Sequence, residues 1–519
     1  MHTMPVTNIN SRRELFTDQS LVESTFGDIS FRLHHPVPRE VINEIEDEYR
    51  CPYRYMTVFQ DVDIYRMYYA LVDPARVNAK DTKHPERICY AESRDGIHWE
   101  KPVLGFFEYK GNSQNNIIWM ENESNRFGVG GFSPFKDTNP DCAPEHRYKA
   151  IAEVGPAGKR ALNGNGLVAL SSPDGLHWSM LSSGFVVKPG SELSGFDSQN
   201  LAFRDNERNE YRLYRRASFR EGPLNVCRDI VTYTSTDFIN WGKGERLQYP
   251  GAAPEQLYTN NIIPYFRAPH LFVGFPARYV QRVWSDAFED LPEPERRKAL
   301  IRKSGAEPVK TDPTAAGGQR IGTSLTDTLF MSSRDGVSFH RQPEAFLRPG
   351  LRTKNNWFYP DNFPAWGMLA TPSDIEDAPD ELSFYVSEGC RREGMSNICR
   401  RYSLRMDGFV SAHTSGKGGE LMTSPLIFSG SDLYINFSAS AAGSIKIELQ
   451  DERGWPLPGF GLDECVELLG DDLNRRVRWR SDLSQLAGVP IKVLFKMVDA
   501  DLYSFRFGNR NERPFGGIL

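Results

Sequence analysis

Acidic residues stand where short loops lead into or out of β-rich segments. Asp197 lies in SGFDSQNLAF, Asp361 in NNWFYPDNFPAW, Glu48 in IEDEYRCPYRYMTV, and Glu388 ends YVSEG. Hydrolysis of a glycosidic bond typically uses one carboxylic acid that protonates the leaving oxygen and one carboxylate that attacks the anomeric carbon or activates water. The sequence therefore predicts Asp197, Glu388, Asp361 and Glu48 as catalytic candidates, with turn capping or pairing to arginine as the structural alternative for each.

Polar and aromatic residues accompany these acids. Amide, phenol and guanidinium groups bind sugar hydroxyls or acidic sugars, and aromatic rings stack on the C–H face of a sugar ring. Turn bonding and packing between sheets are the alternatives. The residues predicted to bind substrate are Gln199, Asn200, Arg216, Tyr258, Asn260, Arg278, Trp357 and Tyr359.

A repeated turn motif shows what scaffold would bring these segments together. The copies are SRDGIHW at 93–99, SPDGLHW at 172–178, STDFINW at 235–241 and SRDGVSF at 333–339, with a weaker copy in DGF at 407–409. Ser and Asp side chains bond the backbone just downstream and Gly accepts a positive φ, so each copy predicts a tight hairpin turn followed by an aromatic plug between sheets. Because the copies are roughly 60 to 100 residues apart, each marks one unit of several strands rather than a solenoid repeat.

Alternating, β-rich segments precede each turn. Those farther upstream are 64–71, 147–154, 210–218, 270–279 and 381–389, and a charged insertion at 284–320 is expected on the surface, with room for a short helix. The predicted fold is all-β: a five-bladed β-propeller over residues 28–414 after an N-terminal extension of residues 1–27, followed by a C-terminal β-sandwich over 415–519. The loops before the innermost strands would converge on an axial pocket.

Composition narrows the partners. The 62 basic and 68 acidic residues are interleaved, which argues against nucleic acid or an anionic membrane and favours a carbohydrate. Seven scattered cysteines show no zinc-ligand spacing, and Walker, HExxH and GxSxG motifs are missing, so no metal and no cofactor are expected. The start of the chain has no apolar signal segment, which predicts a cytoplasmic protein, or a secreted or periplasmic one if a signal peptide has been removed. The oligomeric state is left open.

The motifs YRMYYA, SRDGIHWEKP, FDSQN, SSRDGVSFHR and RYSLRMDGFVS together resemble propeller proteins related to glycoside hydrolase families 32 and 43. In those relatives a blade-one Asp is nucleophile or base, a second Asp tunes the pKa and a Glu is the acid. The blade-one WMNDPNG type of motif is missing here, so no single role carries over. The repeated turns also look like the structural Asp boxes of sialidases, which have six blades.

The resemblance and the residues together predict a glycoside hydrolase with paired-carboxylate catalysis in the axial pocket. A glycoside phosphorylase, with arginine binding phosphate, and a non-catalytic glycan-binding propeller are the alternatives.

Overall fold

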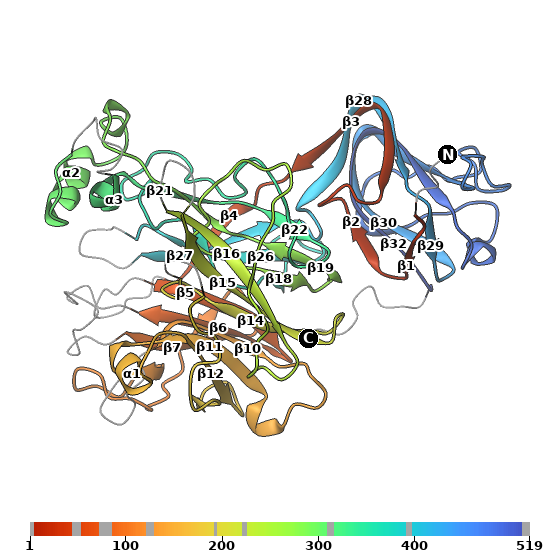
Figure 1. Ribbon diagram of the computed structural model, residues 1–519. Helices are drawn as coiled ribbons and strands as arrows, with labels where there is room; N and C mark the ends of the chain where they lie inside the picture. The colour runs from red at the N-terminus through yellow and green to blue at the C-terminus, as the bar shows by residue number, and fades with distance from the viewer. Residues whose placement is uncertain are drawn as a thin grey trace.

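The computed structural model describes residues 5–43, 53–71, 86–120, 129–190, 195–220, 226–308, 316–390 and 397–510. Within these ranges the chain is mostly β-strand, so the all-β prediction is confirmed. Figure 1 shows two parts: a larger one built from the middle of the chain and a smaller one in which red N-terminal strands lie beside blue C-terminal strands. No helix in the described residues is long and apolar enough to cross a membrane.

The larger part contains five successive antiparallel sheets among the described residues. Sheet 1 has β5 (Tyr53–Asp61), β6 (Ile64–Leu71), β7 (Arg87–Ser93) and β8 (Trp99–Glu100), with β9 (Ile117–Met120) also on β7. Sheet 2 has β10 (Val129–Lys136), β11 (Tyr148–Val154), β12 (Leu167–Ser172) and β13 (Ser179–Met180). Sheet 3 has β14 (Leu201–Asp205), β15 (Glu210–Phe219), β16 (Cys227–Ser235) and β17 (Glu245–Arg246). In these sheets β6, β11 and β15 follow the predicted segments 64–71, 147–154 and 210–218 to within one residue at either end.

Sheets 4 and 5 depart from a simple meander. Sheet 4 has β18 (Ile263–Tyr265), β19 (Ala268–Gly274), β22 (Met331–Ser333) and β23 (His340–Arg341). Sheet 5 has β24 (Phe363–Pro364), β25 (Leu369–Thr371), β26 (Glu381–Glu388), β27 (Ile398–Leu404) and β4 (Val37–Asn43). The segment 270–279, predicted as one strand, is two, because Pro276 follows Gly274 and ends pairing with β22 before β20 (Ala277–Val280) begins.

The insertion between β19 and β22 is more than a surface loop. It pairs β20 with β21 (Leu325–Thr328) and carries α2 (Pro294–Lys303) and α3 (Ala316–Thr323), seen at the upper left of Figure 1. Trp284, Phe288 and Ile301 form a small apolar core of their own there. A further short helix, α1 (Pro156–Ala161), joins β11 to β12.

The repeated motif forms the predicted turn in four sheets. In sheet 2, Ser172 Oγ accepts the backbone N–H of Gly175 at 2.8 Å, and Asp174 Oδ1 accepts those of Leu176 at 2.8 Å and His177 at 2.9 Å. Equivalent bonds occur at Asp95, Asp237 and Asp335. The same short pattern therefore folds the same way each time, because its side chains satisfy the turn backbone locally.

These turns also join neighbouring sheets. The hydroxyl of Tyr385 in β26 donates to the carbonyl of Gly96 at 2.6 Å, and that of Tyr214 in β15 donates to Gly336 at 2.8 Å. A Cβ on Gly96 would lie 2.7 Å from Thr371 Cγ2 and its φ is +72°, so glycine avoids both a clash and backbone strain at this position. The first contact ties sheet 1 to sheet 5, the last of the series.

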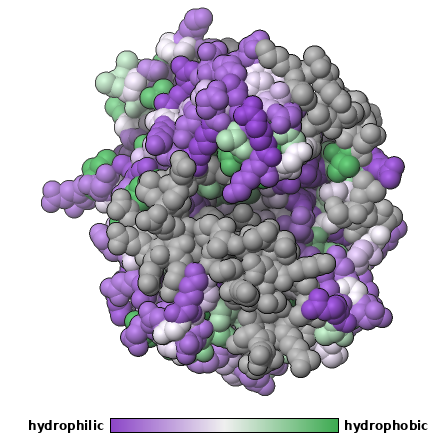
Figure 2. Space-filling view, turned by 90° about the vertical axis from the view of Figure 1, so that its left-hand side faces the viewer, coloured by the Kyte–Doolittle hydropathy of each residue, from purple (hydrophilic) through white to green (hydrophobic). Residues whose placement is uncertain are grey.

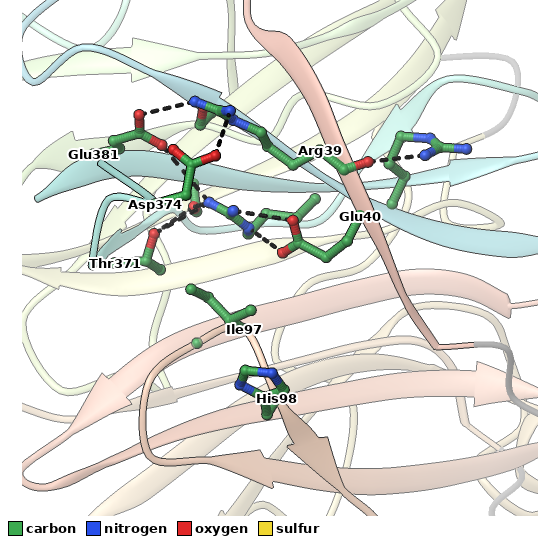
Figure 3. A network of polar contacts seen from close by, with 12 residues as sticks. Arg39, Glu40, Ile97, His98, Thr371, Asp374 and Glu381 are labelled. Atoms are coloured by element: carbon green, nitrogen blue, oxygen red, sulfur yellow. Dashed lines mark hydrogen bonds and ion pairs between the residues drawn. The ribbon is translucent and has the colours of Figure 1, made fainter. Parts of the chain in front are cut away.

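Sheet 5 receives its outer strand from the N-terminal side of the chain, since β4 pairs with β27. Figure 3 shows the side chains that hold β4 in place. Arg39 pairs with Asp374 at 3.1 Å and Glu381 at 3.0 Å, while Glu40 accepts from Arg401 at 3.1 Å. In the same view His98, in the turn before β8, lies below Glu40.

The smaller part is one strongly bent sheet of long strands with the order β3-β28-β32-β30-β31, and β2 also pairs with β32. The bounds are β2 (Arg13–Leu15), β3 (Val22–Leu33), β28 (Val410–Thr423), β30 (Asp432–Gln450), β31 (Asp471–Arg476) and β32 (Lys492–Gly508). A parallel pair, β1 (Thr7–Asn10) with β29 (Leu426–Phe428), adjoins it. The boundaries predicted at residues 28 and 415 fall inside β3 and β28, so the N-terminal residues contribute strands rather than forming a separate extension.

The weaker fifth copy of the turn motif has a different structure. Asp407 is fully buried, with Arg13 at 3.2 Å, Arg267 at 3.4 Å and Ser504 Oγ at 2.7 Å. Its carboxylate binds side chains of β2, sheet 4 and β32 instead of its own turn. The prediction of a fifth turn of the same kind was wrong, because a DGF tripeptide lacks the Ser that completes the local hydrogen bonds.

Candidate functional site

Asp197 lies just before β14, the first strand of sheet 3, as the sequence predicts. Its side chain is 69% exposed and forms an ion pair with Arg216 of β15, whose side chain is only 4% exposed. The Asp197 carbonyl accepts a 3.4 Å hydrogen bond from Tyr55 of β5, and Ser198 Oγ donates to the Tyr258 carbonyl at 3.0 Å. Segments of sheets 1, 3 and 4 thus meet at an accessible carboxylate.

Next to Asp197 lies a group of residues that we call the arginine–tyrosine cluster. Its members come from β15, β16, β20, α3 and the loops before β18 and β24, and they are Arg216, Arg228, Tyr258, Tyr279, Arg320 and Tyr359. The three tyrosines are buried, whereas Arg228 and Arg320 are partly exposed. Each arginine lies over a tyrosine ring, so cation–π contacts hold the cluster together.

Hydrogen bonds link the phenol groups of the cluster. Tyr359 donates its hydroxyl to that of Tyr258 at 2.9 Å, and Arg320 Nη2 donates to both tyrosines, at 3.3 Å to Tyr258. The carbon Cζ of Arg216 is 4.5 Å from the centre of the Tyr258 ring. The oxygen of Tyr258 therefore lies in a strongly positive environment.

This environment changes how Tyr258 titrates. Burial alone would raise the pKa of its phenol, but Arg216, Arg320 and the hydrogen bond from Tyr359 lower it to about 7. The pKa of Arg228 is lowered as well, mainly by burial and also by Arg320 and Arg216. The cluster thus carries positive charge that its own members do not neutralise.

Asp361, in the loop before β24, is buried. Its Oδ1 accepts the backbone N–H of Cys390 at 2.8 Å, and its carbonyl accepts a bond from Thr326 at 2.7 Å. Only Pro360 separates it from Tyr359 in the sequence, but its carboxylate is held by the loop after β26. In this conformation Asp361 supports the loop.

Glu388 lies in a different polar network. Its carboxylate accepts from Tyr402 at 2.5 Å and from Arg400 at 3.1 Å, both in β27, and no described contact joins it to Asp197. Burial and the Glu388 carboxylate raise the pKa of the Tyr402 phenol, so Tyr402 stays a hydrogen-bond donor. The fourth catalytic candidate, Glu48, lies outside the described residues.

The predicted binding residues divide into two groups. Arg216, Tyr258 and Tyr359 belong to the cluster. Gln199 instead donates to the Met56 carbonyl at 3.1 Å, and Asn200 to the Ser198 carbonyl at 2.8 Å, so both serve the fold.

The other predicted binding residues also make internal contacts. Arg278 bridges Asp327 at 2.6 Å and Glu255 at 2.6 Å. Asn260 is buried and accepts from the backbone of Ile262 at 3.4 Å, whereas Trp357 donates to the Gly350 carbonyl at 3.0 Å. Together they stabilise the loops around the site.

Three members of the cluster escape sequence analysis: Arg228, Tyr279 and Arg320. Tyr279 follows Arg278 directly in β20. Arg228, the second residue of β16, pairs with Ser218, two residues after Arg216 in β15, so strand positions could have suggested both. Arg320 belongs to α3 in the insertion, and no local sequence pattern indicates where this helix packs or which way its side chains face. Within the described residues, no group of three His, Cys, Asp or Glu is placed to hold a metal ion.

Figure 2 shows the side of the molecule from which α2 and α3 project in Figure 1. Hydrophilic side chains, in purple, predominate among the coloured atoms and border a recess near the middle of this face.

Comparisons with known proteins give distant structural likenesses. No family model matches the chain, and no curated protein matches it. An N-acetylgalactosamine deacetylase from F. plautii, solved with a blood group B trisaccharide, is 13% identical with a TM-score of 0.41, over 73% of this chain and 95% of that one.

Two further similar structures are glycoside hydrolases. A fructofuranosidase from Schwanniomyces occidentalis is 10% identical with a TM-score of 0.38, over 93% and 100% of the two chains. A family 117 glycoside hydrolase from Zobellia galactanivorans is 11% identical with a TM-score of 0.38, over 72% and 90%. Likenesses with TM-scores this low assign neither activity nor substrate to the chain.

Proposed function

We propose that this protein is a glycoside hydrolase whose five sheets are the blades of a β-propeller. The inner segments of the sheets bond to one another: Trp366 donates its backbone N–H to Met56 and its indole N–H to Ile262, at 2.8 and 3.0 Å. Gln199 also binds Met56, and these contacts support a common centre for sheets 1, 3, 4 and 5. The contact of Tyr385 with Gly96 between sheets 5 and 1 supports a closed ring.

The observation that carries the proposed activity is the exposed carboxylate of Asp197 beside a buried arginine. Arg216 stabilises its negative charge and fixes its orientation, while the exposed side leaves room for a sugar. A carboxylate so placed can attack an anomeric carbon or activate water. Asp361 and Glu388 are the candidates for the second group, which would protonate the leaving oxygen.

The test is a screen of aryl glycosides and oligosaccharides with and without phosphate. On any substrate that is turned over, Asp197→Asn should lower kcat by at least about a hundredfold, the usual contribution of a catalytic acid or base. Asp141→Asn, an exposed residue of the loop between β10 and β11, is the matched control and should leave kcat unchanged. Full activity of Asp197→Asn would contradict the proposal.

Asp361→Asn and Glu388→Gln measured on the same substrate identify the second carboxylate. The second candidate function is glycoside phosphorolysis, favoured by the arginines of the cluster, since guanidinium groups bind phosphate well. Turnover that requires phosphate would establish it. Sugar binding without turnover would instead indicate a glycan-binding protein.

A further inference from the structure

The arginine–tyrosine cluster has more positive than negative charge. Arg216 is paired with Asp197, but Arg228 bonds only the neutral amide of Gln256, at 2.6 Å, among the described residues. Arg320 bonds the phenols of Tyr258 and Tyr359. Within the described part of the chain, neither Arg228 nor Arg320 has a carboxylate partner.

Two carboxylates on neighbouring segments, Glu255 in the loop before β18 and Asp327 in β21, are already engaged. Glu255 pairs with Arg278 at 2.6 Å and with Arg341 at 3.1 Å, and Asp327 pairs with Arg278 at 2.6 Å. They therefore have their own cations to neutralise. Among the described residues, no carboxylate therefore neutralises the excess charge of the cluster, and this charge can attract an anionic ligand.

Buried hydrogen-bond donors without an acceptor also favour an anionic ligand at the cluster. Nε and Nη1 of Arg216 and Nε of Arg320 have no hydrogen-bond partner among the described residues. Buried N–H groups without an acceptor are costly, and proteins keep them mainly where an acceptor arrives with a ligand or water. An oxyanion at the partly exposed side of Arg228 and Arg320 would offset this positive charge.

We propose that Arg228 and Arg320 bind the carboxylate of an acidic sugar, so that the substrate class is glycosides that contain a uronic acid. That the ligand is a sugar rests on the proposed function. That it carries a carboxylate rests on the positive charge of the arginine–tyrosine cluster. Arginine forms paired hydrogen bonds with a carboxylate, and Arg216 adds its charge from behind. A singly charged ligand suits a site beside Asp197, which would repel the doubly charged form of phosphate more strongly.

The test measures binding rather than turnover. Titration calorimetry of the full chain with D-galacturonate, D-glucuronate, the matching neutral sugars and inorganic phosphate separates the possibilities. At least one uronate should bind about tenfold or more tightly than its neutral counterpart and than phosphate. Arg320→Gln and Arg228→Gln should each weaken uronate binding about tenfold, and Arg302→Gln, an exposed arginine of α2, should leave it unchanged.

A second readout uses the wild-type protein alone. Bound carboxylate next to Arg320 should raise the pKa of Tyr258, which ultraviolet absorption of its phenolate reports, whereas neutral sugars should not. Equal binding of neutral and acidic sugars, tighter binding of phosphate, or uronate binding that both arginine variants retain would overturn the inference. Uronate binding without any hydrolysis would leave the inference standing and contradict only the proposed hydrolase.

Discussion

At the scale of single residues, Tyr258 is the most informative group in the site. A buried phenol normally titrates at a raised pKa, because burial disfavours the phenolate. Here Arg216, Arg320 and Tyr359 outweigh burial and bring the pKa to about 7. Tyr258 therefore reports the electrostatic state of the cluster near neutral pH.

We expect a phenolate absorption step near pH 7 in the folded protein, and its loss in Tyr258→Phe. The pKa of Tyr258 is lower in the folded protein than in the unfolded chain, so ionisation of this phenol stabilises the folded state. This stabilisation is fully present above the pKa of the unfolded chain and is lost as pH falls through about 7. The stability of wild type relative to Tyr258→Phe should thus rise with pH above 7.

Two variants check this assignment. Arg320→Gln should move the step to higher pH, since it removes one of the two cations that stabilise the phenolate. Tyr402→Phe, which removes a phenol of raised pKa in another network, should leave the step in place. A step that survives in Tyr258→Phe would assign it to a different group.

At the scale of elements, the repeated turn is a structural unit shared by sheets 1 to 4. The Asp174 carboxylate accepts hydrogen bonds from two backbone N–H groups, and its second oxygen lies 2.7 Å from the ring nitrogen Nδ1 of His177. Burial raises the pKa of Asp174, but the hydrogen bonds from His177 and Leu176 lower it to about 2. The turn therefore favours the ionised carboxylate.

Asp174→Ala should lower the free energy of unfolding by about 1 to 2 kcal/mol, the usual cost of losing a side chain that caps backbone donors. Urea unfolding with far-ultraviolet circular dichroism measures this loss. His177→Ala removes an exposed ring but keeps both backbone bonds, so it should cost less than about 0.5 kcal/mol. Equal effects of the two variants would mean that the backbone bonds contribute little.

At the scale of the whole molecule, Asp407 joins parts of the chain that are distant in sequence. Burial alone would raise the pKa of Asp407, but Arg267 and Arg13 hold it well below its usual range. Tyr265 donates its hydroxyl to the same carboxylate at 2.7 Å. This single charged group thus fixes sheet 4 against the N-terminal strand β2 and the C-terminal strand β32.

Asp407→Asn should destabilise the protein by about 3 to 5 kcal/mol, because it leaves buried guanidinium charges without their anion. Differential scanning calorimetry should show a lower Tm for both parts of the molecule, since both contribute residues to this network. Asp471→Asn breaks a half-exposed pair with Arg405 and should cost less than about 1 kcal/mol. An Asp407→Asn protein with wild-type Tm would exclude the bridging role.

The sequence by itself determined the local structure and the first candidate of the site. The Ser-x-Asp turns and the strands at 64–71 and 210–218 could be predicted because their hydrogen bonds and alternation are local. The position of Asp197 before a first strand followed from the same segments, and the structure places it beside Arg216. Whether Glu388 belongs to the same site depends on its neighbours in space, and the structure shows its carboxylate bonded to Tyr402 and Arg400.

Only the tertiary structure decided the long-range pairings. β4 completes sheet 5 and β3 joins the C-terminal sheet through backbone hydrogen bonds. Because many different sequences can form such bonds, the residues of either strand do not indicate its partner. Arg228 and Arg320 approach Tyr258 from separate elements, so the charge excess exists only in the folded chain. Local hydrogen bonds can be read from neighbouring residues, whereas an electrostatic site is the sum of groups that the fold brings together.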